Sequence, residues 1–205
     1  MSDGTPAGTR IVADLAPGPA DGAGQLRAEI EGGILFEGVT AEHGQQLWRS
    51  DGTAAGTKLV RDFWPDWHGG APRVLGTLDG QAFVTFQSWS MLHHLWVSDG
   101  TADGTRFLRA VDPLTPSPGG EASLCWYQAV VAESQVFLRA CTGVSPWRLF
   151  RSDGTPDGTY PIHDSFTAFG TLEDSVLFTS WDEEHGEEPW ISDGTPHQWI
   201  TPAGE

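Results

Sequence analysis

The sequence predicts an all-β protein, a four-bladed β-propeller of four-stranded antiparallel blades, and three observations lead to this prediction. The string Ser-Asp-Gly-Thr occurs five times, beginning at Ser2, Ser50, Ser98, Ser152 and Ser192. The copies are spaced by 48, 48, 54 and 40 residues, and a period of about 40–50 residues is typical of propeller blades. The segments between them are short apolar stretches bounded by Gly or Asp, without helical periodicity.

Each interval divides into four expected strands. In the first, apolar stretches at 26–30 and 34–39 precede a strand that contains Leu47 and Trp48. The Asp-Gly-Thr turn follows, and a fourth strand is expected at 58–63. The same division gives blades of about 25–63, 73–111, 122–164 and 166–201 within a single propeller domain, residues 1–205.

The two ends of the chain are incomplete in opposite ways. The chain begins with an expected fourth strand, 9–15, and it ends with a unit that loses the second Gly-Thr and reads Pro196-His197-Gln198. The N-terminal strand can therefore complete the last blade, close the ring and remove its open edges. The alternatives are an open array, in which 199–201 is the last fourth strand, and a larger ring formed by a dimer.

The repeated turn has a structural interpretation. An Asp side chain at the start of a turn accepts hydrogen bonds from backbone N–H groups two or three residues later, and Gly supplies a positive φ. We therefore assign a structural role to Asp51, Asp99, Asp153 and Asp193. Calcium bound at these turns is the alternative, although Ca²⁺ needs six to eight oxygen ligands.

The turn and the Leu-Trp pair before it resemble the bacterial repeat family with the consensus ELWxxDGT, and the resemblance covers essentially the whole chain. The Glu of that consensus is replaced by Gln46, His94 and Arg148 and is retained as Glu188. The family consists mostly of secreted or surface proteins, so the resemblance implies an extracellular or cell-surface location in a bacterium. Residues 1–25 contain no signal peptide, which leaves a cytoplasmic location open.

The net charge of −17 excludes some partners. A strongly acidic surface repels nucleic acids and anionic lipid headgroups. No run approaches 18 apolar residues, so no segment is expected to insert into a membrane. A glycan or a protein remains as the expected partner, and the oligomeric state is left open.

Unusual aromatic and histidine residues concentrate in the loops expected opposite the Asp-Gly-Thr turns. Aromatic side chains exposed in loops on a rigid scaffold suggest binding. We therefore predict a ligand-recognition module for carbohydrate or protein, with little indication of an enzyme. Its candidate ligand-binding residues are Trp64, Trp67, His68, Trp89, His93, His94, Trp147 and Trp181.

A metal-dependent enzyme at the same loops is the alternative function. His43 and His185 occupy the same repeat position, five residues before the Trp of the third strand, and His93 lies two residues away from that register. If these loops converge, two or three of the histidines, together with Glu184 or Asp182, could bind zinc or copper. The sequence contains no Gly-x-Ser-x-Gly motif, no His-Glu-x-x-His motif and no Gly-rich phosphate loop, and no catalytic residue can be assigned. Its abundant acidic pairs leave glycosidase chemistry open.

The two cysteines, Cys125 and Cys141, flank an expected hairpin. If its turn centres on Glu133, paired residue numbers sum to 266, and the two cysteines face each other within disulfide distance. A shift of one residue in the register would place them on opposite faces, so two reduced cysteines remain the alternative.

Overall fold

The computed structural model describes residues 4–63, 70, 72–87, 93–111, 128–140 and 147–195, without the side chains of 25–27, 87, 93 and 111. The chain divides into two compact units, residues 1–111 and 112–205, and each unit is described by itself. The described residues form strands and turns. None of these residues belongs to a helix that could cross a membrane.

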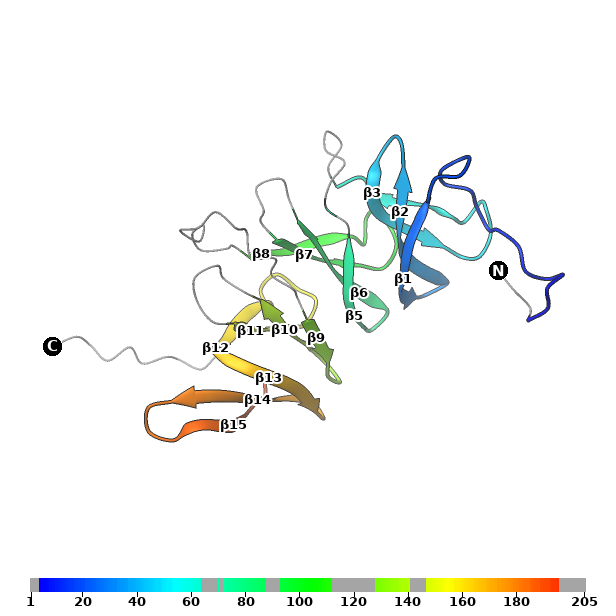
Figure 1. The fold of residues 1–205 in the computed structure, drawn as a ribbon. Coiled ribbons are helices and arrows are strands. Elements are labelled where there is room, and N and C mark those ends of the chain that lie inside the picture. Colours follow the sequence, from blue (N-terminus) through cyan, green and yellow to red (C-terminus); the bar gives the residue numbers. More distant parts are fainter. Residues whose placement is uncertain are drawn as a thin grey trace. The chain divides into compact units, whose positions relative to one another are not determined.

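Unit 1 contains two four-stranded antiparallel sheets in which the strands lie in chain order (Figure 1). The first sheet consists of β1 (Ala23–Ile30), β2 (Gly33–Thr40), β3 (Gly44–Ser50) and β4 (Lys58–Arg61). The second consists of β5 (Arg73–Leu78), β6 (Gln81–Gln87), β7 (His93–Ser98) and β8 (Arg106–Val111).

Unit 2 contains one four-stranded and one three-stranded antiparallel sheet. The first consists of β9 (Gln128–Val131), β10 (Val136–Ala140), β11 (Arg148–Ser152) and β12 (Tyr160–Asp164). The second consists of β13 (Phe166–Leu172), β14 (Ser175–Asp182) and β15 (Gly186–Ser192). The all-β class and the four antiparallel sheets confirm the predicted repeat at this level.

Within each unit the two sheets pack by the same rule. Leu35 and Leu47, which are fully buried, lie on one face of the first sheet and pack against Ala82, Val84 and Phe86 of the second. In unit 2, Phe137 and Leu149 occupy the same positions as Leu35 and Leu47 and pack against Val176 and Phe178. Because side chains alternate along a strand, the repeated register places equivalent residues on equivalent faces.

The Asp-Gly-Thr turns share one hydrogen-bond network. Asp51 Oδ1 accepts hydrogen bonds from the amide of Thr53 at 2.8 Å and from its hydroxyl at 2.7 Å. The Thr57 hydroxyl contacts the Ser50 hydroxyl at 2.7 Å and donates to the Thr53 carbonyl at 2.7 Å. The same bonds recur in the turns that begin at Asp99 and Asp153. They join the end of the third strand to the start of the fourth.

The N-terminal segment differs from its prediction. Residues 9–15 form no strand in this structure, because a strand requires a neighbour and none pairs with this segment in unit 1. The residues before it, 4–9, nevertheless form the hydrogen bonds of the second half of an Asp-Gly-Thr turn. Gly8 N–H donates to the Thr5 hydroxyl at 3.0 Å, and the Thr9 hydroxyl donates to the Thr5 carbonyl at 2.9 Å.

The predicted register of the β9–β10 hairpin is wrong by one residue. Val131 pairs with Val136 and Gln128 with Arg139, so paired residue numbers sum to 267 rather than 266. The turn centres between Glu133 and Ser134, because the amide of Ala132 donates to the carbonyl of Gln135. This register does not support the pairing of Cys125 with Cys141 that a sum of 266 predicted. Cys125 and Cys141 themselves lie outside the described residues.

A glycine substitution tests the turn network. A Cβ on Gly158 would overlap the Asp153 carboxylate, whereas a Cβ on Gly170 in the same unit has no neighbour within 4 Å. We expect Gly158→Ala to lower the free energy of unfolding by about 1–3 kcal/mol, as in other overpacked sites. Gly170→Ala should change it by less than about 0.5 kcal/mol. Urea denaturation measures both, and an equal effect of the two would contradict the proposed crowding.

Candidate functional site

Four of the eight predicted binding residues are described, and each lies at or near the end of a strand: His93, His94, Trp147 and Trp181. In each antiparallel sheet the turn between the second and third strands lies at the end opposite the Asp-Gly-Thr turn. His93 begins β7, and its side chain is not described. Four further predicted residues lie outside the described residues: Trp64, Trp67, His68 and Trp89.

Two predicted binding residues are used in packing. The guanidinium of Arg139 lies 3.7 Å from the ring centre of Trp147, which packs against the core of unit 2. His94 is partly buried in β7, with its ring centre 5.7 Å from that of Phe107. Burial lowers the pKa of His94 because it disfavours the charged imidazolium. Both side chains therefore have a structural explanation that needs no ligand.

Among the predicted binding residues whose side chains the structure describes, Trp181 is the exposed one. Its side chain is 62% exposed near the end of β14. It begins the acidic hairpin, by which we mean residues 181–188. The other exposed or partly exposed members of this hairpin include five carboxylates: Asp182, Glu183, Glu184, Glu187 and Glu188.

Asp182 fixes the backbone of the acidic hairpin. Its Oδ1 accepts hydrogen bonds from the amides of His185 at 2.6 Å and Glu184 at 2.9 Å. The bond from the His185 backbone is the main reason that the pKa of Asp182 lies below its usual value. Asp182 therefore remains ionised at neutral pH, and the exposed Trp181 stands beside a fixed negative charge.

His43 belongs to a polar network that sequence reasoning missed. Its Nδ1 lies 3.0 Å from Asp62 Oδ2, and the other carboxylate oxygen accepts a hydrogen bond from Gln46 Nε2 at 3.2 Å. Gln46 Nε2 also donates to the carbonyl of His43. The network links the β2–β3 turn to the end of the fourth strand. Its partner Asp62 could be recognised only after the strands were paired.

His185 occupies the equivalent turn in unit 2 but has a different environment. Its side chain is 60% exposed and contacts Asp182 within the same turn at 3.2 Å. Within the described parts of the chain, no group of three or more His, Cys, Asp or Glu side chains is arranged to hold a metal ion. The zinc or copper site therefore stays a prediction from the sequence.

The turn aspartates are held ionised by their own turns. Hydrogen bonds from Thr53 lower the pKa of Asp51, and those from Thr195 lower the pKa of Asp193. For Asp99 and Asp153, burial is the largest single influence and raises the pKa. The hydrogen bonds from Thr101 and Thr155 together outweigh it, so the pKa of each carboxyl lies below its usual value. In each turn Oδ1 already accepts two hydrogen bonds. These contacts support the structural interpretation of the motif.

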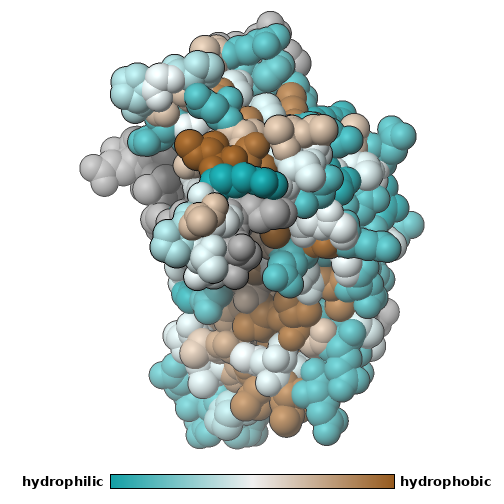
Figure 2. Space-filling view, turned by 90° about the vertical axis from the view of Figure 1, so that its right-hand side faces the viewer, coloured by the Kyte–Doolittle hydropathy of each residue, from teal (hydrophilic) through white to brown (hydrophobic). Residues whose placement is uncertain are grey.

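Several large apolar side chains remain exposed, and Figure 2 shows apolar patches within a largely hydrophilic surface. Those in the last sheet include Leu177, Trp190 and Ile191. The edge groove, a hollow of about 1120 Å³ in unit 2, runs beside β15 and is lined by residues that include His163, Phe178, Trp190 and Asp193. Trp181 and Asp182 lie at the same groove.

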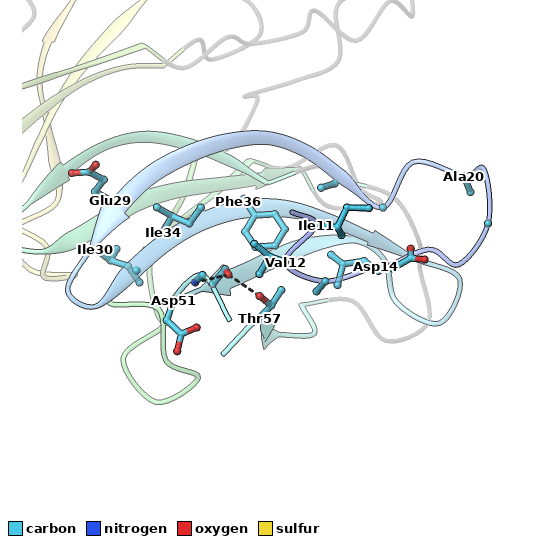
Figure 3. Close-up of a pocket in the computed structure, with 18 residues that line it drawn as sticks. Ile11, Val12, Asp14, Ala20, Glu29, Ile30, Ile34, Phe36, Asp51 and Thr57 are labelled. Atoms are coloured by element: carbon cyan, nitrogen blue, oxygen red, sulfur yellow. Dashed lines mark hydrogen bonds between the residues drawn. The ribbon is translucent and has the colours of Figure 1, made fainter. Parts of the chain in front are cut away.

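Unit 1 contains a second pocket, of about 830 Å³. Figure 3 shows Ile11 and Val12 of the N-terminal segment beside Ile34 and Phe36 of β2. Ile11 lines this pocket but is 81% exposed. Its apolar side chain is therefore largely in contact with solvent.

No family model and no curated protein matches this chain. The resemblance to the ELWxxDGT repeat family therefore stays a prediction from the sequence motif alone.

Acid should destabilise the turns. Because the pKa of Asp99 is lower in the folded protein than in the unfolded chain, its contribution is present above about pH 4 and is lost as the pH falls through the folded value. We expect Asp99→Asn to lower the thermal midpoint at pH 7 and to reduce the further loss between pH 4 and 2. Circular dichroism melts measure both. The control Asp103→Asn leaves the Thr101 bonds in place, and an equal acid response in both variants would contradict the assignment.

Proposed function

We propose that this protein is a recognition module that binds a protein partner through its acidic hairpin. The observation that carries the proposal is the 62% exposure of Trp181 beside several carboxylates. Trp is among the residues that most often anchor protein interfaces, and exposed loop residues on a rigid sheet commonly mediate binding.

The charge of the hairpin selects the chemistry of the partner. The acidic hairpin combines Trp181 with five carboxylates, of which Glu187 lies opposite Trp181 on the neighbouring strand. The whole chain carries a net charge of −17. A Lys or Arg side chain would gain both from the carboxylates and from the face of the indole ring. We therefore propose a partner that presents basic and apolar side chains together.

We also propose that the four sheets are the blades of one propeller. The repeated packing rule supports this arrangement, since each unit places the face that contains Leu35 or Phe137 against the following sheet. The motif resemblance supports an extracellular or cell-surface location, where such a module would meet its partner.

A Trp181→Ala variant tests the binding site. On an array of basic, neutral and acidic peptides, the unmodified protein should select basic peptides that contain an apolar residue. Trp181→Ala should weaken that binding about tenfold or more, as truncation of an interface anchor does. Leu172→Ala is the control, because Leu172 is 56% exposed on the same sheet but lies outside the hairpin.

The salt dependence of binding and a glycan array distinguish a basic protein partner from a carbohydrate ligand. Binding should weaken as salt is raised, because exposed charges are screened. If a glycan array gives Trp181-dependent binding and the peptides give none, the ligand is a carbohydrate and the protein-partner proposal is wrong. Equal binding by Trp181→Ala and the unmodified protein would also contradict it.

A further inference from the structure

We propose that the pocket in unit 1 binds a small amphiphilic amine, whose apolar body fills the pocket and whose ammonium group lies at an acidic rim. This inference does not depend on the recognition function, because the residues that line the pocket all belong to unit 1. Three features of the pocket support it: an apolar floor, a roof that leaves it open to solvent, and carboxylates at its edge.

The floor of the pocket is one face of the first sheet. Side chains alternate along β2, so Ile34 and Phe36 point to the face opposite Leu35. Leu35 packs against the second sheet, whereas Ile34 and Phe36 line the pocket. Val84 holds the position of Phe36 in the second sheet and is buried against the first. A face that is covered by a neighbouring sheet in one repeat therefore borders a pocket in the other.

The N-terminal segment forms the roof. Ile11 and Val12 of this segment line the pocket together with β2 (Figure 3). The segment is anchored where it returns to β1, because the amide of Val39 donates to the carbonyl of Gly22 at 2.9 Å. Gly22 also packs closely on the segment, since a Cβ there would lie 2.8 Å from the backbone nitrogen of Ala16. The roof is thus attached to the sheet, but the exposure of Ile11 shows that it does not seal the pocket.

The size and the lining of the pocket suit a small molecule with an apolar body. Its volume of about 830 Å³ lies within the range of about 300–1,000 Å³ that small-molecule sites occupy. The apolar lining includes Ile11, Val12, Leu15, Ile34 and Phe36. A hydrocarbon chain placed against these side chains would remove apolar surface from water, which favours binding in proportion to the area buried.

The charges around the pocket favour a cation. Asp14, Glu29 and Asp51 line it, and all three are exposed. None of the described residues that line the pocket is Lys, Arg or His. Figure 3 shows the three carboxylates around the apolar side chains and not between them. An amphiphile could therefore place its chain in the centre and its ammonium group at the rim.

Asp51 contributes a permanent negative charge to this rim. Its Oδ1 accepts two hydrogen bonds from Thr53, and these bonds hold the pKa of Asp51 below its usual value. Because Asp51 is ionised at neutral pH, it attracts an ammonium group and repels a carboxylate. Exposed charge pairs interact weakly, so the charges should determine selectivity while the apolar lining supplies most of the affinity.

Three probes of equal chain length test the proposal on the full chain. Octylamine, octanol and octanoate share one apolar chain and are cationic, neutral and anionic at neutral pH. We expect octylamine to bind about threefold or more tightly than octanol, as exposed ion pairs allow, and octanoate to bind most weakly. Titrations followed by methyl NMR measure the three affinities. They also locate the site through the methyl groups of Ile11, Val12, Leu15 and Ile34.

Two exposed positions separate the charged from the apolar contribution. Asp14→Asn should weaken octylamine binding about twofold to fivefold and leave octanol binding unchanged, because it removes only a charge. Ile11→Ser should weaken the binding of both probes, because it removes apolar contact area. The matched controls are Asp103→Asn, an exposed acid of unit 1 that does not line the pocket, and Leu172→Ser in unit 2. Neither control should change binding.

Each outcome decides the proposal. Preference for octylamine, with shifts confined to the methyl groups of the pocket, supports it. If octanol or octanoate binds as tightly as octylamine, selection of a cation is wrong. Equal shifts of Leu177 and Ile191, which are exposed in unit 2, would indicate adsorption to any apolar surface. That result, or no binding at millimolar probe concentrations, would overturn the proposed site.

Discussion

The structure depends on the fit of one aspartate carboxylate inside each turn. The carboxylate accepts two hydrogen bonds from the threonine two residues later, and its position leaves no space for a Cβ on the second glycine. A hydroxyl pair, such as Ser98 and Thr105 at 2.8 Å, then joins the last residue of the third strand to the residue before the fourth. Because these contacts are local, every complete copy folds the same turn wherever it stands in the chain.

Sheet packing follows from that local constraint. The pairing of the second and third strands, together with the period of two in each strand, places Leu35 and Leu47, or Phe137 and Leu149, on the same face. Those faces are covered by the next sheet within each unit. The last sheet has Leu177 and Pro189 at the equivalent positions, and both are exposed. Within the described part of unit 2, this face of the last sheet therefore lacks the apolar cover that the face with Phe137 and Leu149 has.

Local features could be predicted from the sequence, whereas contacts between residues far apart in the chain could not. The Asp-Gly-Thr turns and the first two strands, expected at 26–30 and 34–39, follow from residues a few positions apart, and the described residues form them. The 9–15 strand requires a distant partner, so its propensity alone could not establish it. The register of the β9–β10 hairpin depends on whether its turn centres on Glu133 or between Glu133 and Ser134. Likewise, the cover of Trp147 by Arg139 and the pairing of His43 with Asp62 become visible only after the strands align.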